Sequence, residues 1–170
     1  MRFPYDIISQ IEQNYHVFQA SLSGIPKELE LFKINSESWC LLEIICHLLD
    51  EEVYDFRTRI KHILETPEFS FKPISPTTWP IDHQYLHQNF QEILLKFLEE
   101  RNQSVIWLKG LKTVSWELST IHPEKGAMSA KTFLENWLAH DFLHIRQINA
   151  LKRAYFNTNS SDNLTYAGNW

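Results

Sequence analysis

Two histidines four residues apart are the first residues whose spacing suggests chemistry. His140 and His144 lie in a segment with helical apolar periodicity, so both rings project from one side of that helix. Asn136 and Gln147 fall on the same stripe. Apolar residues surround much of this helix, which implies burial, and a buried imidazole without a partner costs about 1–3 kcal/mol. Each ring therefore needs a hydrogen bond, a water or a metal ion, and HExxH zinc sites use the same i,i+4 spacing.

A third histidine stands in an apolar segment elsewhere in the chain. His47 has Ile44, Ile45, Leu48 and Leu49 as neighbours, where a histidine is otherwise out of place. Asp50 and Glu51 follow at i+3 and i+4, where a carboxylate can orient the imidazole or gather charge near an ion. Three histidines from two helices leave coordination positions open, unlike a structural zinc with four protein ligands. The sequence thus predicts one divalent transition metal on the ligands His47, His140 and His144.

Other histidines and both cysteines are expected outside the site. His83 and His87 repeat the i,i+4 spacing, but their neighbours are polar, and a solvated face is the expected environment. Cys46 adjoins His47, yet adjacent side chains on a helix diverge by about 100° and cannot readily share an ion. The single histidines expected on the surface or in loops are His16, His62 and His122. The two thiols, Cys40 and Cys46, are expected to be reduced.

Length and composition favour one cytoplasmic domain. The chain has 170 residues, of which 44% are hydrophobic, enough to build a substantial core. A net charge of -5 without long charged blocks argues against nucleic acid or anionic membranes as partners. The first residues, MRFPYD, lack the apolar region of a signal peptide. We therefore expect a cytoplasmic protein that acts on a small molecule.

Four stretches of helical periodicity predict an all-α fold, a four-helix bundle with long crossover connections. We expect helices at 5–22, from Ser36 or Ser38 to 65, at 82–110 and at 129–155. Four prolines exclude a regular helix from the connection 67–80, and 114–128 is expected to be an irregular or short extended excursion. The bundle should occupy residues 1–156, followed by a loosely held polar tail at 157–170.

Several motifs resemble the DinB-like superfamily. Residues 140–148, HDFLHIRQI, are similar to its last-helix signature HDxxHxxQI. Ser38 and Trp39 followed by residues 43–50, EIICHLLD, resemble its second helix, in which a tryptophan-led start precedes a metal histidine. Residues 97–101, FLEER, and then Trp116, His122-Pro123 and Gly126, are similar to the subgroup of YfiT-like thiol transferases. The resemblance spans residues 5–155.

The resemblance implies that His47, His140 and His144 hold zinc, nickel or another divalent ion. The leading expectation is a metal-dependent transferase that activates a low-molecular-weight thiol, because coordination to a divalent cation deprotonates a thiol. Asp50 or Glu51 would tune the ion, and Gln147 or Asn136 would position substrate. The alternatives are a metal-dependent hydrolase that activates water and a non-enzymatic metal-dependent ligand-binding or stress-response module. A homodimer is also an expectation from the family.

Overall fold

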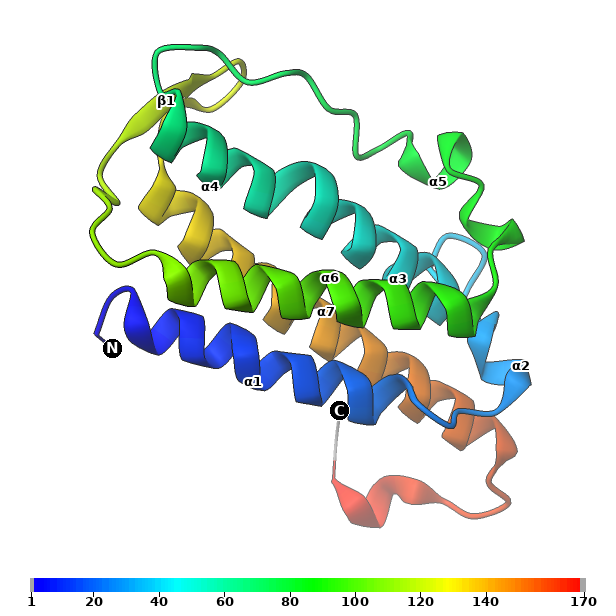
Figure 1. Ribbon diagram of the computed structural model, residues 1–170. Coiled ribbons are helices and arrows are strands. Elements are labelled where there is room, and N and C mark those ends of the chain that lie inside the picture. The colour runs from blue at the N-terminus through cyan, green and yellow to red at the C-terminus, as the bar shows by residue number, and fades with distance from the viewer. Residues whose placement is uncertain (1, 169–170) are drawn as a thin grey trace.

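The computed structural model describes residues 2–168 and confirms the four-helix bundle (Figure 1). The second long helical segment is continuous but contains one π-helical turn. The long elements are α1 (Tyr5–Leu22), α3 (Leu41–Asp50), η1 (Glu51–Asp55), α4 (Phe56–Glu65), α6 (Phe90–Gly110) and α7 (Ala130–Asn159). The short helical elements are α2 (Lys27–Glu30), α5 (Trp79–Asp82), η2 (Tyr85–His87) and η3 (Leu164–Ala167).

The excursion before the last helix contains a small antiparallel hairpin. Strand β1 (Ser119–His122) pairs with β2 (Gly126–Ser129), with Ser119 opposite Ser129. Gly126 has a φ of 73°, in the left-handed region that glycine adopts without steric cost. The segment is therefore extended over two short strands, in agreement with the short extended excursion expected at 114–128.

The second helical segment begins later than the predicted Ser36 or Ser38. Its first residue is Leu41 and its N-cap is Cys40, whose backbone N–H donates to the Glu43 carboxylate at 3.0 Å. Ser38 instead belongs to a preceding turn, where its hydroxyl donates to the Asn35 carbonyl oxygen. A local capping interaction thus fixes the start of the helix that carries His47.

The third long helix also begins later, at Phe90 rather than at Asp82. Asp82 ends the short helix α5, and Gln84 then adopts a φ of 50°, which interrupts helical geometry. Asn89 caps α6 by accepting a hydrogen bond from the Glu92 N–H at 3.1 Å. The last helix begins as expected after its cap Ser129, but it continues to Asn159, beyond the predicted residue 155.

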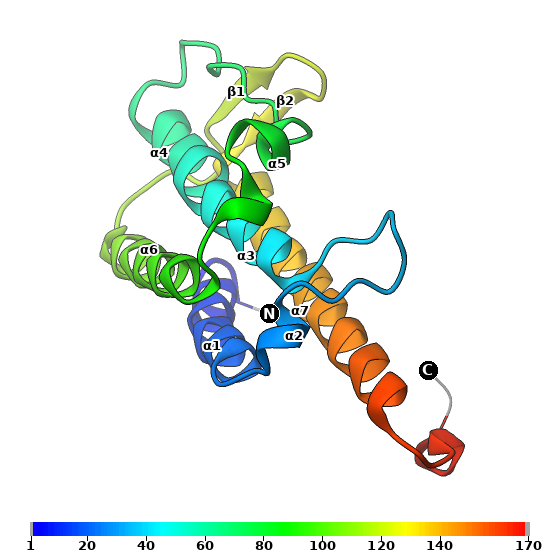
Figure 2. The same ribbon diagram turned by 90° about the vertical axis from the view of Figure 1, so that its right-hand side faces the viewer.

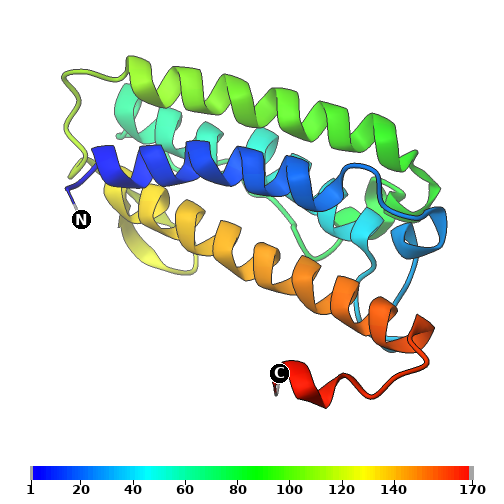
Figure 3. The same cartoon turned by 90° about the horizontal axis from the view of Figure 1, so that it is seen from below.

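The long connection after α4 determines the topology of the bundle. Helix α1 packs against α6 and α7, and the α3–α4 segment packs against the same two helices from the other side. Figure 1 shows that the connection runs back along the bundle, so that α6 has the same direction as α3–α4. Seen from below, α1 lies between α6 and α7 (Figure 3). The α3–α4 segment therefore faces α7, and His47 can meet the histidines of the last helix.

The core has two apolar halves with a polar layer between them. One half contains Phe18, Ile44, Phe97 and Ile148, and the other contains Ile11, Ile60, Leu134 and Trp137. On each long helix, buried polar residues occupy the positions between the halves: Asn14 on α1, Glu51 and Glu52 on η1, Arg101 on α6, and Asp141 and His144 on α7. Within residues 2–168, the helices lack the length of apolar sequence that a membrane span requires.

Candidate metal centre

Three imidazole rings converge between α3 and α7. His140 Nε2 lies 3.1 Å from His47 Nε2 and 3.0 Å from His144 Nε2. The potential ligand atoms of the three rings all lie within 4.8 Å of one another. His140 and His144 are one turn apart on α7, and His47 approaches from the facing helix. The structure therefore brings together the three residues that the sequence predicted as ligands.

The arrangement of nitrogen atoms fits a bound cation. A neutral imidazole carries one N–H and one lone pair, so three converging nitrogens cannot all be satisfied by hydrogen bonds to one another. A cation at their centre would accept all three lone pairs. Two nitrogens bound at about 2.0–2.1 Å to one tetrahedral ion would lie about 3.3 Å apart. The observed contacts of 3.0 and 3.1 Å are close to this separation.

Burial keeps these rings neutral, which is the form that binds a metal. Burial lowers the pKa of His47 to about 3 and the pKa of His140 to about 2, with repulsion among the rings adding to the effect. Burial also lowers the pKa of His144. The lone pairs are therefore free at neutral pH, and no proton has to leave before an ion binds.

Gln147 orients one of the rings. Its side-chain oxygen Oε1 lies 2.9 Å from Nδ1 of His144 and accepts the proton on that nitrogen. The Nε2 lone pair of His144 is thereby directed to the other rings, which is the usual role of a hydrogen bond behind a histidine ligand. By contrast, His47 Nδ1 is buried and has no hydrogen-bond partner among residues 2–168. Gln147 therefore contacts a candidate ligand directly.

Glu51 is the carboxylate nearest to the histidines. Its Oε1 lies 3.7 Å from His47 Nε2, and its carboxyl group hydrogen-bonds the carboxyl group of Asp55. Burial, with the neighbouring Asp55, raises the pKa of Glu51 to about 8. Asp50, the other carboxylate expected near His47, instead lies 2.5 Å from the Tyr85 hydroxyl and 2.7 Å from His83 Nδ1.

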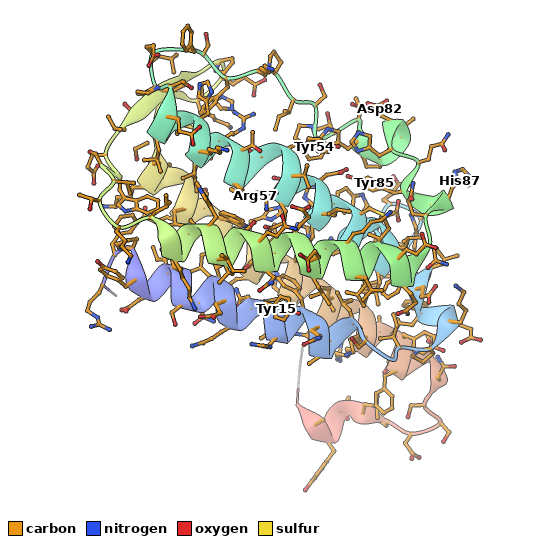
Figure 4. The ribbon with its side chains drawn as sticks, in the orientation of Figure 1. Tyr15, Tyr54, Arg57, Asp82, Tyr85 and His87 are labelled. Carbon is orange, nitrogen blue, oxygen red and sulfur yellow. The ribbon has the colours of Figure 1, made fainter. Side chains whose placement is uncertain are left out.

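The remaining predicted residues make other contacts. Asn136 is exposed and donates to the Thr132 carbonyl oxygen at 2.8 Å, so its contact is within its own helix. His83 is half-buried against Asp50 and stacks on Trp79, which corrects the expectation of a solvated face. His87 is exposed as expected and lies at the outer end of the bundle (Figure 4).

A π-helical turn aligns the side chains that follow His47. Four residues of an α-helix overshoot one full turn by about 40°, so an i,i+4 series drifts around the helix. In η1 the Phe56 N–H donates to the Glu51 carbonyl oxygen, five residues back, and this wider turn reverses the drift. His47, Glu51 and Asp55 therefore remain in contact along one face. Such turns often occur at functional sites.

The polar layer beside the histidines contains charged residues that sequence reasoning missed. Arg101 is 1% exposed and donates to Glu52 at 2.5 Å and to both oxygens of Asp141 at 2.6 and 2.7 Å. Burial alone would lower the pKa of Arg101, but the two carboxylates raise it, so the guanidinium stays charged. Asp141 directly follows His140, so the ion pair between Arg101 and Asp141 fixes the part of α7 that presents the ligands. The sequence does carry one signal for this layer, because Arg101 is a charged residue within the apolar stripe of α6.

Comparisons with known proteins identify the family of this chain. The sequence profile of the DinB superfamily matches residues 10–148, and the chain therefore belongs to this superfamily. This confirms the family that the motifs resembled. No curated protein gives a significant match to the sequence.

A solved structure shares the architecture. The structure of YfiT from Bacillus subtilis, described as a probable metal-dependent hydrolase with an unusual four-helix bundle topology, superposes with a TM-score of 0.77 at 17% sequence identity. The match covers 87% of this chain and 85% of YfiT. At this level of identity the similarity establishes the fold, and function has to be argued from the site.

Proposed function

We propose that this chain is a metal-dependent hydrolase in which His47, His140 and His144 hold one divalent transition metal. The observation that carries the proposal is the carboxylate of Glu51, 3.7 Å from His47 Nε2 and beside the converging rings. Three protein ligands leave positions open for water and substrate, and a carboxylate within reach of such a water is a suitable general base. The description of YfiT as a probable metal-dependent hydrolase supports the same reaction class.

The residues of the chain have distinct roles in this proposal. A bound divalent ion would act as a Lewis acid and lower the pKa of a coordinated water. The pKa of Glu51 is raised to about 8 in the metal-free chain, and the positive charge of a bound ion would lower it. Its carboxylate would then accept the proton of the attacking water and pass it to the leaving group. Gln147 holds His144 in the tautomer that directs Nε2 to the ion. The aromatic rings of Trp39 and Phe56, with centroids 5.0 Å from His47 and 5.3 Å from His140, limit access of bulk water.

The donor set favours a second candidate, transfer of a low-molecular-weight thiol. All three ligands are neutral, so the full charge of the ion acts on a fourth ligand, and a coordinated thiol is deprotonated without a separate base. The thiol would come from a second molecule, because Cys40 and Cys46 are buried in the apolar core and not at the rings. In this reaction Glu51 would be dispensable, whereas hydrolysis needs it.

Metal content is the first test of both candidates. Protein purified without added metal should carry one transition metal per chain by elemental analysis, with zinc or nickel expected. His47→Ala and His140→Ala should each lose the metal, because two histidines bind an ion weakly. His87→Ala is the matched control, since this exposed histidine lies away from the site and its loss should leave the stoichiometry unchanged. A wild-type protein that takes up no stoichiometric ion would refute both candidates.

Glu51→Gln separates hydrolysis from thiol transfer. Removing a general base typically costs about 10²–10⁴-fold in rate, so the variant should lose hydrolysis of activated esters and amides by this factor while keeping its metal. Thiol transfer to an aromatic halide should remain within a few-fold. Glu100→Gln is the control, because Glu100 pairs with Arg57 on the α6 side of the bundle. Hydrolysis that survives in Glu51→Gln would overturn the first candidate, and turnover that strictly requires added thiol would establish the second.

A further inference from the structure

A pocket lies next to Asp55 and Arg59, and its polar residues have no role in the reaction described above. Its volume is about 480 Å³, within the range of sites for small molecules. The walls come from η1 and α4, from the connection after α4, and from the end of β1 with the turn that follows it. Figure 2 shows these segments together at the top of the view, on one side of the bundle. The pocket is therefore built by segments far apart in the sequence.

Arg59 is the central cation of this pocket. The residue is 6% exposed, and its Nε lies 2.5 Å from Asp55 Oδ1. Its Nη1 is buried without a hydrogen-bond partner in the described chain, residues 2–168. An arginine has five N–H groups, and a buried donor left unpaired costs free energy. A ligand that accepts a hydrogen bond would remove this cost.

The guanidinium of Arg59 is held in a fixed orientation. Its central carbon lies 4.6 Å from the centroid of the Phe71 ring and 5.8 Å from that of Phe133. These two rings pack edge to face with centroids 5.5 Å apart. Stacking on aromatic rings fixes the planar group without using its N–H donors. The donors stay available for a planar oxyanion.

The charges around the pocket favour an anion. Arg59, Lys72 and Lys125 supply three positive charges, whereas Asp55 and Glu124 supply two carboxyl groups. His122 adds a further nitrogen donor to the wall. Lys72 and Lys125 are exposed and can adjust to a ligand, while Arg59 is buried. One preorganised guanidinium with two mobile ammonium groups is a suitable set for a carboxylate or a phosphate.

The pocket is connected to the histidines by carboxyl groups on one helix face. Asp55 lines the pocket and hydrogen-bonds Glu51, whose Oε1 lies 3.7 Å from His47 Nε2. The order from the rings to the pocket is therefore Glu51, Asp55 and Arg59. A ligand held at Arg59 would thus lie on the same side of the α3–α4 segment as the proposed reaction site.

We propose that this pocket binds the carboxylate or phosphate group of an anionic substrate, with Arg59 as its anchor. The inference rests on the proposed function only in treating the bound anion as part of a substrate. It makes the preferred substrates small acids or phosphorylated molecules rather than neutral esters. Arg59 is in this view a specificity residue and not a catalytic one.

Anion binding to the metal-free protein tests the proposal. Inorganic phosphate and succinate are titrated separately at constant ionic strength, and amide and arginine side-chain NMR signals are followed. We expect saturable shifts in the low millimolar range that centre on Arg59, with at least one of the two anions. Arg59→Gln should weaken binding by about tenfold or more, because it removes a charge-assisted hydrogen bond. Lys72→Gln, at an exposed position, should weaken it by a smaller factor.

Arg57→Gln is the matched control. Arg57 lies on the same helix but donates to Glu100 and Ser104 of α6 (Figure 4), so its loss should not change anion affinity. If Arg59→Gln does not fold, Arg59→Lys keeps the charge but loses the planar donor pair, and it should still weaken binding. Absence of saturable shifts in the wild type would overturn the proposal, as would equal affinities in wild type, Arg59→Lys and Lys72→Gln. No metal or turnover is involved, so this failure is distinct from failure of the proposed function.

Discussion

Replacing Arg101 with methionine is the sharpest test of the polar layer. Methionine is flexible and fills the space of the aliphatic part of the arginine side chain, but it donates no hydrogen bond. The substitution removes the donors that contact Glu52 at 2.5 Å and Asp141 at 2.6 and 2.7 Å. Glu52 is 1% exposed and Asp141 is 0% exposed, so neither carboxylate can turn to solvent. Some other hydrogen bonds remain, from Ser104 to Glu52 and from Asn14 to Asp141.

The expected destabilisation follows from the loss of the only cation shown in contact with both carboxylates in residues 2–168. Removing one partner of a buried ion pair costs about 3–5 kcal/mol, because a buried charge is left uncompensated. For 170 residues the entropy of unfolding is about 0.36 kcal/mol per kelvin, at about 2.1 cal/mol/K per residue. The melting temperature should therefore fall by about 8–14 °C. A loss of about 3–5 kcal/mol is a large part of the free energy of unfolding of a typical domain.

The assay is thermal unfolding followed by circular dichroism, with Arg57→Met as the matched control. Arg57 also pairs with a carboxylate, but its side chain and that of Glu100 are 21% and 27% exposed, so the control should lose at most about 1 kcal/mol. Burial raises the pKa of Glu52, so this carboxylate takes up a proton as the pH falls, and the deficit of Arg101→Met should shrink. A decrease in melting temperature no larger than that of the control, or a deficit that does not change with pH, would refute the argument.

Two further predictions concern the histidines. In the metal-free protein the pKa of His47 is lowered to about 3 and that of His140 to about 2, while unfolded histidine titrates near 6.5. The unfolded state therefore binds more protons below about pH 6.5. As the pH is lowered from this value, the free energy of unfolding should fall by up to about 1.4 kcal/mol per ring for each pH unit. Urea unfolding at several pH values measures this slope, and a flat profile would contradict the assigned burial. Gln147→Leu removes the acceptor behind His144 and should weaken metal binding by about 10–100-fold in a chelator competition. Asn136→Leu changes an exposed side chain on the same helix and should leave metal affinity unchanged. Equal losses of metal affinity in both variants would exclude orientation of His144 by Gln147.

The sequence alone determined the long helices and the candidate ligands, because both depend on local patterns. The apolar period of α1 predicted its bounds at Tyr5–Leu22, and Ser129 marked the start of α7. His47 was conspicuous because its neighbours are apolar. His140 and His144 share one helix face whatever the arrangement of the helices, because they are four residues apart. Starts that depend on a particular cap, such as Cys40 and Asn89, were misplaced because several polar residues nearby compete for that role.

Only the tertiary structure decided which polar groups meet. Arg101 follows Phe97 by four residues and so interrupts the apolar stripe of α6, which shows that it needs a partner but not which one. Its partners lie 49 and 40 residues away, and they become neighbours because the long connection sets the order and direction of the helices. The π-helical turn η1 likewise changes which side chains share a face, because it keeps Asp55 beside Glu51. Periodicity reports which face of a helix is buried, whereas the contacts of that face depend on how separate helices pack.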